Sequence, residues 1–314
     1  MKNGASLIKS AVRALAKHPR MLVPLILCWL AYAPLVVAFR FHIDWGAYEQ
    51  WMQILIAFSG VLLLSLAFAW SAFVLIELIR QIEMDEEPRL YQALAKAVAN
   101  TIMALPIVLA WAVIWLLLLI LEAIFSKKRS DDSDTAYNPE NIAKTVAGYG
   151  QFSLSSAFFE ALQKGVRMLA FLIFPAIAWE RLGTFASIKK GLGIARTHKS
   201  EFAAGFVLTE LAALIVFIPP AILFYISREF DVSFPDAVWF GTMIYCAFAW
   251  SFALFLEQMF VAELYLWHLI WEREVENAAS EGRRKPHLVD VKRPSVMDGV
   301  ADLYLTRLGE TPAR

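Results

Sequence analysis

Six long apolar stretches restrict the fold of this 314-residue chain more than any other feature. A helix needs about 20 mostly apolar residues to cross ~30 Å of hydrocarbon, because lipid offers the backbone no hydrogen-bond partners. Apolar residues make up 59% and charged residues 18% of the chain, and the charges gather between the stretches. The sequence therefore predicts an all-α integral membrane protein, a helical bundle with six spans at residues 21–40, 52–79, 101–125, 157–179, 202–226 and 238–270.

Two of these stretches are related by a gapless offset of 180 residues. Residues 67–77 read AFAWSAFVLIE, and residues 247–257 read AFAWSFALFLE. The same offset pairs Lys9 with Lys189. We interpret the pattern as a parallel internal repeat, because copies that lie four spans apart share one orientation. Chance similarity between aromatic-rich spans is the alternative interpretation.

Small residues and tryptophans mark further positions in the spans. Ala67 and Ser71 lie four residues apart, as do their counterparts in the second copy, and small residues at this spacing favour close helix packing. Trp267 and Trp271, at the end of the sixth stretch, are expected to be anchors at the membrane interface.

Short amphipathic segments rich in Lys and Arg precede the first, third and fifth stretches. Such segments suit the membrane surface, where basic side chains reach anionic headgroups and apolar side chains dip inward. The sequence therefore predicts three short interfacial helices and three units of interfacial helix, span, outer loop and span. The units cover about residues 1–80, 88–180 and 184–271, within a transmembrane domain over 1–271. The expected headgroup contacts are Arg13, Lys17, Lys96, Lys190 and Arg196.

Lys and Arg are distributed unevenly between the two sides of the bundle. Residues 1–20, 80–100 and 180–201 carry 13 of them, whereas the three alternate loops carry five. Because basic loops stay in the cytoplasm, both termini are predicted to be cytoplasmic. No organelle-targeting or lipidation signal is visible, so we expect the bacterial cytoplasmic (inner) membrane.

Two polar segments interrupt the apolar pattern. Asp131, Asp132 and Asp134 lie in the loop 126–150, but they lack the spacing of a calcium loop, so no metal site is expected. Residues 272–314 form a predicted cytoplasmic tail with a short helix over 296–308, which is expected to dock on the bundle or on a protein partner.

Acidic residues in the spans are the candidate functional residues, because a buried charge in lipid needs a partner or a purpose. Glu210 lies deepest, and it is either a proton or substrate site or a structural acid. As a structural acid it would be hydrogen-bonded to a neighbouring span or contacted by a basic residue of an interfacial helix. Glu77 and Glu257 occupy equivalent positions in the repeat, and Glu180 ends the fourth span similarly. We interpret these three as structural clamps.

The expected partners of two clamps follow from the repeat. Glu77 is predicted to pair with Lys9, and Glu257 with Lys189. Both lysines belong to the basic interfacial segments.

Several functional classes lack their characteristic residues. The chain has no Gly-rich phosphate loop, no His-Glu-x-x-His pair and no Gly-x-Ser-x-Gly elbow, and its five histidines are scattered in the sequence. No catalytic residue, cofactor or metal is predicted. Nucleic-acid binding is not expected either, because the basic residues lie at membrane borders.

One segment is similar to a known family. Residues 174–196 read FPAIAWERLGTFASIKKGLGIAR, an apolar span that ends in an acid and is followed by a basic amphipathic helix. This pattern resembles the YciC-like inner-membrane proteins and the related membrane domain associated with glycerophosphodiester phosphodiesterases. The resemblance implies a six-span bundle of unassigned activity, and it carries over no catalytic residue.

The sequence favours a non-enzymatic inner-membrane protein that acts as a lipid-interacting scaffold or accessory subunit. Its expected partners are membrane lipids with anionic headgroups on the cytoplasmic side. The alternative is a transporter or lipid-moving protein with Glu210 near its path. An intramembrane enzyme is a third, weaker reading.

Overall fold

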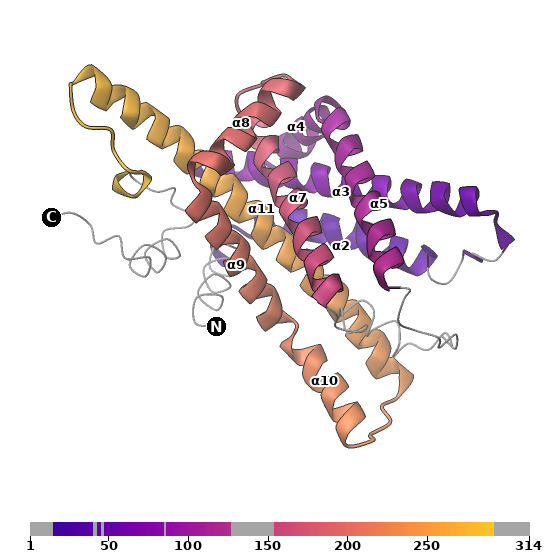
Figure 1. The fold of residues 1–314 in the computed structure, drawn as a ribbon. Coiled ribbons are helices and arrows are strands. Elements are labelled where there is room, and N and C mark those ends of the chain that lie inside the picture. The colour runs from indigo at the N-terminus through magenta and orange to yellow at the C-terminus, as the bar shows by residue number, and fades with distance from the viewer. Residues whose placement is uncertain (1–14, 40–42, 45–46, 85, 127–153, 292–314) are drawn as a thin grey trace.

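The structure is a computed structural model that describes residues 15–39, 43–44, 47–84, 86–126 and 154–291. All regular structure in these residues is helical. Figure 1 shows the helices as a splayed bundle. The helices, in chain order, are η1 (Pro19–Met21), α2 (Leu22–Val37), α3 (Gln50–Glu83), α4 (Leu90–Met103), α5 (Leu105–Ser126), α7 (Leu154–Ala178), α8 (Thr184–Thr197), α9 (Lys199–Val216), α10 (Ile218–Glu229), α11 (Asp236–Ser280) and η4 (Leu288–Asp290).

Three to five of the described helices are long and apolar enough to cross a membrane. α3, α7 and α11 qualify singly, while α4 with α5 and α9 with α10 qualify only as bent pairs. α2 is apolar but has only 16 residues, fewer than a span of ~30 Å requires. The prediction of an all-helical protein with several helices apolar enough to span a membrane is therefore confirmed, whereas the described residues do not confirm the count of six spans.

The core lies where α3, α7 and α11 each pack against the other two. Aromatic side chains fill it: the rings of Phe73 and Phe174 are 4.8 Å apart, and Trp250 of α11 lies 5.2 Å from Phe68 and 4.3 Å from Tyr32 of α2. Such ring pairs add directional contacts to the area that they bury.

The two copies of the 180-residue pattern have different surroundings. The Ser71 hydroxyl donates to the Pro24 carbonyl of α2 at 2.8 Å, whereas the Ser251 hydroxyl donates to the Ala247 carbonyl of its own helix at 3.0 Å. Both serines are fully buried. The copies therefore share burial and position in a long helix, but not hydrogen-bond partners.

Two helix breaks occur at different kinds of sequence. α9 and α10 bend by 48° at Phe217, directly before Ile218, Pro219 and Pro220. Proline lacks a backbone N–H and its ring disfavours a helical predecessor, so the fifth stretch is not one straight helix. α4 and α5 bend by 70° at Ala104, which separates the amphipathic helix α4 from the apolar helix α5 close to the predicted start of the third stretch.

The amphipathic helices α4 and α8 lie toward the same end of the bundle, at the top of Figure 1. α4 packs on α3, and α8 packs on α7. The contact of α8 is close at Gly191, where an added Cβ would lie 3.2 Å from the Ile173 Cα. The amphipathic segments predicted before the third and fifth stretches are therefore helices, α4 and α8.

The last long helix continues past the predicted start of the tail, to Ser280. The chain then reverses at Gly282, whose φ of 65° favours glycine, and returns along the helix. The Trp271 indole donates to the Pro286 carbonyl at 3.0 Å, and the Trp267 indole donates to the Val291 carbonyl at 3.3 Å. The two tryptophans hold this returning segment. The predicted helix over 296–308 lies outside the described residues.

Candidate functional site

Four charged side chains from α7, α9 and α11 form a network within the apolar bundle. α7 contributes Lys164 and Arg167, α9 contributes Glu210, and α11 contributes Glu257. Residues three apart on a helix share one face, so both cations of α7 point toward the two acidic helices. Two acids meet two bases, and the network has no net formal charge.

The Arg167–Glu257 pair is the most buried part of this network. Arg167 donates from Nε to one carboxylate oxygen at 2.7 Å and from its terminal nitrogen to the other at 2.8 Å. The Glu257 side chain is only 3% exposed. The planar guanidinium matches both carboxylate oxygens, which is the strong arrangement for a buried ion pair.

Lys164 connects this pair to Glu210. Its Nζ lies 2.5 Å from Glu210 Oε2 and 3.7 Å from Glu257 Oε1. The same ammonium donates to the Phe206 carbonyl at 3.2 Å and lies 4.8 Å from the Phe206 ring centroid. Lys164 is 5% exposed, whereas the Glu210 side chain is 46% exposed. The network therefore runs from the outer side of α9 to the centre of the bundle.

A second charged cluster lies at the C-terminal end of α3. The buried Glu77 carboxylate accepts hydrogen bonds from Arg80 at 2.7 and 3.1 Å, from Lys96 of α4 at 2.7 Å and from Gln81 at 3.1 Å. Glu77 thus joins α3 to the amphipathic helix α4. The contact is consistent with a clamp. Its cations, however, come from α3 itself and from α4, and not from the basic segment at the start of the chain.

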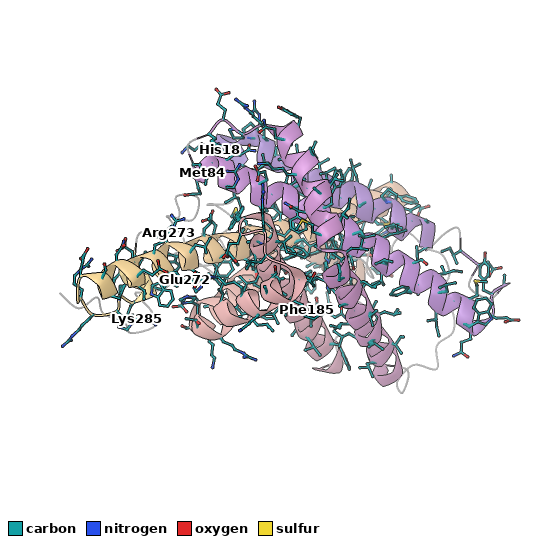
Figure 2. All side chains as sticks on the ribbon, turned by 90° about the horizontal axis from the view of Figure 1, so that it is seen from above. His18, Met84, Phe185, Glu272, Arg273 and Lys285 are labelled. Atoms are coloured by element: carbon teal, nitrogen blue, oxygen red, sulfur yellow. The ribbon has the colours of Figure 1, made fainter. Side chains whose placement is uncertain are left out.

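A third polar cluster joins α8 to the C-terminal half of α11. Lys190 lies 2.6 Å from Glu272 and 3.9 Å from Glu180, and the Tyr265 hydroxyl donates to the Glu180 carboxylate. Figure 2 shows Glu272 on α11, with Lys285 on the segment that follows. Glu180 therefore belongs to a network that ties α8 to α11.

Two histidines complete that third cluster. His198 Nε2 and His268 Nδ1 lie 2.9 Å apart, and His268 Nε2 lies 3.1 Å from Glu272. Both rings are buried, and burial lowers the pKa of His198, while the nearby Glu201 carboxylate raises it and Lys285 lowers it. Burial therefore favours the neutral imidazole of His198 over its charged form.

The structure corrects the predicted partners of the acidic residues. Glu257 contacts Arg167 and Lys164 of α7, not Lys189, whose side chain is exposed on α8. Residue Lys9, the predicted partner of Glu77, lies outside the described residues, and Glu77 is held by Arg80 and Lys96. The offset of 180 did not identify the cations that hold these acids, because those cations come from neighbours in space.

The predicted headgroup contacts fall into two groups. Lys17 and Arg196 are exposed, whereas Lys96 and Lys190 already contact carboxylates. Residue Arg13 lies outside the described residues, as do the three aspartates of the polar loop. Among the described residues no group of three or more metal-binding side chains converges.

The two cations of α7, Lys164 and Arg167, are not among the residues singled out from the sequence. A lysine and an arginine three residues apart in an apolar stretch are the signal, since such a pair requires acidic partners. The histidine pair left no signal, because His198 and His268 are 70 residues apart.

Comparison with family models, with curated proteins and with solved structures gives no match for this chain.

Proposed function

We propose that this chain is a non-enzymatic, multi-pass membrane protein that acts as a lipid-interacting scaffold or accessory subunit. The observation that supports this best is the outer surface of α4 and α8. Tyr91, Val98 and Ile102 follow one stripe of α4 and are all exposed, and Phe185 on α8 is 87% exposed. Apolar stripes beside basic residues are the pattern of helices that lie in a membrane interface.

The charge network supports the same proposal. Each acid of the three clusters has a basic partner within 4 Å: Glu77, Glu180, Glu210, Glu257 and Glu272. Paired charges between helices fix the relative positions of those helices, which is a structural role. A scaffold needs such a fixed arrangement, and it needs no reacting group.

The remaining parts of the proposal follow from the sequence. In this proposal the chain has six spans in three units, with a parallel repeat between the first and third units. Both termini lie in the cytoplasm of a bacterial cell, and the chain is a member of the YciC-like family. The tail from residue 272 onward is the proposed docking segment for a protein partner. Anionic headgroups on the cytoplasmic side are the proposed lipid partners.

Lipid preference tests this proposal. The purified full-length protein should unfold at a higher temperature with added phosphatidylglycerol than with added phosphatidylcholine, because basic residues flank the exposed apolar stripes. A Phe185→Ser variant should lose part of the stabilisation. Phe230→Ser, an exposed phenylalanine that follows α10, is the matched control and should keep it. Equal stabilisation of the wild type by both lipids would contradict the proposal.

A transporter or lipid-moving protein is the second candidate, and the continuity of the charge network favours it. Glu210, Lys164 and Glu257 are linked by contacts of 2.5 and 3.7 Å, from a half-exposed carboxylate to a buried one. Chains of acids and bases with this arrangement occur along proton paths in membrane proteins.

Glu210→Gln separates the two candidates, because glutamine keeps a hydrogen bond to Lys164 but cannot exchange a proton. The scaffold predicts near-normal thermal stability and no proton flux into proteoliposomes for either the wild type or the variant. The transporter predicts flux for the wild type that Glu210→Gln abolishes. Glu229→Gln, at the exposed end of α10, is the control and should leave any flux unchanged.

A further inference from the structure

A pocket of about 550 Å³ opens between the C-terminal end of α3, the helix α4 and the turn after α7. It lies at the end of the bundle that Figure 2 views from above, where Met84 is labelled. Its lining combines charged or polar side chains with apolar ones. The charged ones are Glu77, Arg80, Lys96 and Arg181, and the apolar ones include Met103 and Trp179.

Glu77 holds two cations at the wall of this pocket. Its carboxylate is 4% exposed and contacts Arg80 and Lys96, each at 2.7 Å. The side chains of Arg80 and Lys96 are 23% and 50% exposed. One buried acid therefore positions two partly exposed cations, and with Arg181 the pocket carries an excess of positive charge. Arg80 also lies 3.7 Å from Glu86, which does not line the pocket.

Several N–H donors of these cations remain free to bind a ligand. An ammonium has three donors and Lys96 uses one of them for Glu77, while Arg80 uses three of its five for Glu77 and Met84. Converging donors on lysine and arginine are the groups that bind phosphate oxygens.

Arg181 adds a third cation from an unusual backbone position. Its φ is 52°, and it follows α7 where the Leu182 N–H bonds back to the Ala176 carbonyl at 3.1 Å. Glycine is the favoured residue in such a helix-terminating turn, and a side chain there costs about 1 kcal/mol or more. Arg181 has no hydrogen-bond or ion-pair partner among the described residues, and it lines the pocket.

The opposite part of the lining is apolar and continues toward the outer surface of α4. Ala99, Met103 and Trp179 line the pocket, while Val98 and Ile102 are exposed on the adjacent helix face. A soluble anion would gain nothing from these side chains. An acyl chain would bury apolar area against them.

We propose that this pocket binds a phosphate group, supplied by the headgroup of an anionic phospholipid, with Arg80, Lys96 and Arg181 as the binding residues. The inference rests on the proposed lipid-interacting function and assigns a site to it. The acyl chains would extend along the exposed apolar stripe of α4.

The test compares two variants of the full-length protein in neutral detergent. Arg181→Gly removes one cation and places the favoured residue at a positive φ, so the variant should fold normally. Lys189→Gln removes an exposed cation of α8 that does not line the pocket. The probes are short-chain phosphatidylglycerol, short-chain phosphatidylcholine and glycerol phosphate, and the measurement is the Kd from titration calorimetry.

The expected result is that short-chain phosphatidylglycerol binds the wild type more tightly than the other two probes. Arg181→Gly should weaken that binding about tenfold, the effect of losing a charged hydrogen bond. Lys189→Gln should change it less than about twofold, because an exposed charge outside the site is screened.

Three other outcomes would overturn the inference in distinct ways. An equal loss of affinity in both variants would indicate a general attraction to anionic lipid and would rule out the pocket as the binding site. Equal affinity for glycerol phosphate would assign the site to a soluble phosphate compound and not to a lipid. No preference of the wild type for phosphatidylglycerol would overturn both the pocket and the proposed function.

Discussion

At the scale of single residues, the arrangement of charges is decided by pairing. A charge in an apolar bundle is costly unless an opposite charge and hydrogen bonds meet it, and removing one partner costs more than removing both. Glu257 is nearly inaccessible and is held by Arg167 through two hydrogen bonds. The two residues are therefore expected to depend on each other strongly.

The Arg167–Glu257 pair gives a prediction for stability. Glu257→Leu alone should destabilise by about 3 to 5 kcal/mol, since it leaves Arg167 buried without its carboxylate. The double variant Glu257→Leu/Arg167→Met should be more stable than that single variant, because Lys164 and Glu210 still balance each other. Chemical denaturation in detergent measures the free energy of unfolding of both variants.

The outcome that contradicts this prediction is a double variant at least as unstable as Glu257→Leu. A matched control is Glu281→Gln, which breaks an ion pair of 2.5 Å between two largely exposed side chains. That change should leave the midpoint of unfolding unchanged, because exposed ion pairs contribute little to stability.

His198 gives a prediction for the pH dependence of stability. Burial lowers its pKa in the folded state below the ordinary value of 6.5. Below that value the unfolded chain takes up a proton first, so stability is lost as pH falls from 6.5 toward the folded pKa. The groups facing the ring are Glu201 on its own helix, His268, Trp271 and Glu272 on α11, and Lys285 on the returning segment.

The measurement is the apparent Tm of the wild type and of His198→Gln between about pH 7.5 and about pH 5.5. The wild type should lose more stability than the variant over this range, since glutamine does not titrate. Parallel curves for the two proteins would show that His198 is not a source of the pH dependence.

At the scale of helices, close contacts depend on where glycine occurs. α8 contains Gly191 and Gly193, two residues apart and on opposite sides of the helix. A Cβ on Gly191 would lie 2.8 Å from the Ile173 Cγ1 and 3.2 Å from its Cα, while a Cβ on Gly193 would meet nothing within 4 Å. The contact at Gly191 includes the backbone of Ile173, which does not move aside easily.

The two glycines give opposite predictions for the same substitution. Gly191→Ala should destabilise by ~1 to 2 kcal/mol, because the clash exceeds the gain in helix propensity. Gly193→Ala should be neutral or stabilise by up to ~1 kcal/mol, because alanine is the better helix former and has open space. Apparent Tm values in detergent test both predictions. A Gly191→Ala variant as stable as the wild type would mean that α8 does not pack this closely on α7.

At the scale of the whole molecule, the path of the chain across the membrane is the property on which the proposed function depends. The three helices that qualify singly as spans, α3, α7 and α11, also form the core, and the bent pairs lie around it. Whether each bent pair crosses once determines on which side the loops emerge.

A reporter that is active only in the cytoplasm tests this path. It should report when fused after Ala278 and remain silent when inserted near residue 138, because the basic segments predict cytoplasmic termini and an outer polar loop. A fusion after Arg283 serves as a second cytoplasmic position, beyond the turn at Gly282. Reporter activity near residue 138 would mean that the middle unit has one span fewer than predicted or that it has the reverse orientation.

The sequence by itself determined that the protein is helical and where several of its helices lie. Apolar runs of about 20 residues can satisfy their backbone in lipid only as helices, so run length alone predicts α3, α7 and α11. Amphipathic spacing likewise predicts α4 and α8, and the two prolines after Ile218 explain the break that the apolar pattern concealed.

Only the tertiary structure decided which charges meet. Lys164 and Arg167 reach Glu210 and Glu257 across 46 and 90 residues of sequence, and His198 reaches His268 across 70. Nothing in a local pattern encodes such a distance, because it depends on which helices pack together and how they are rotated. The sequence showed acids within apolar stretches, whereas helix packing selected their partners and brought Arg80, Lys96 and Arg181 to one pocket.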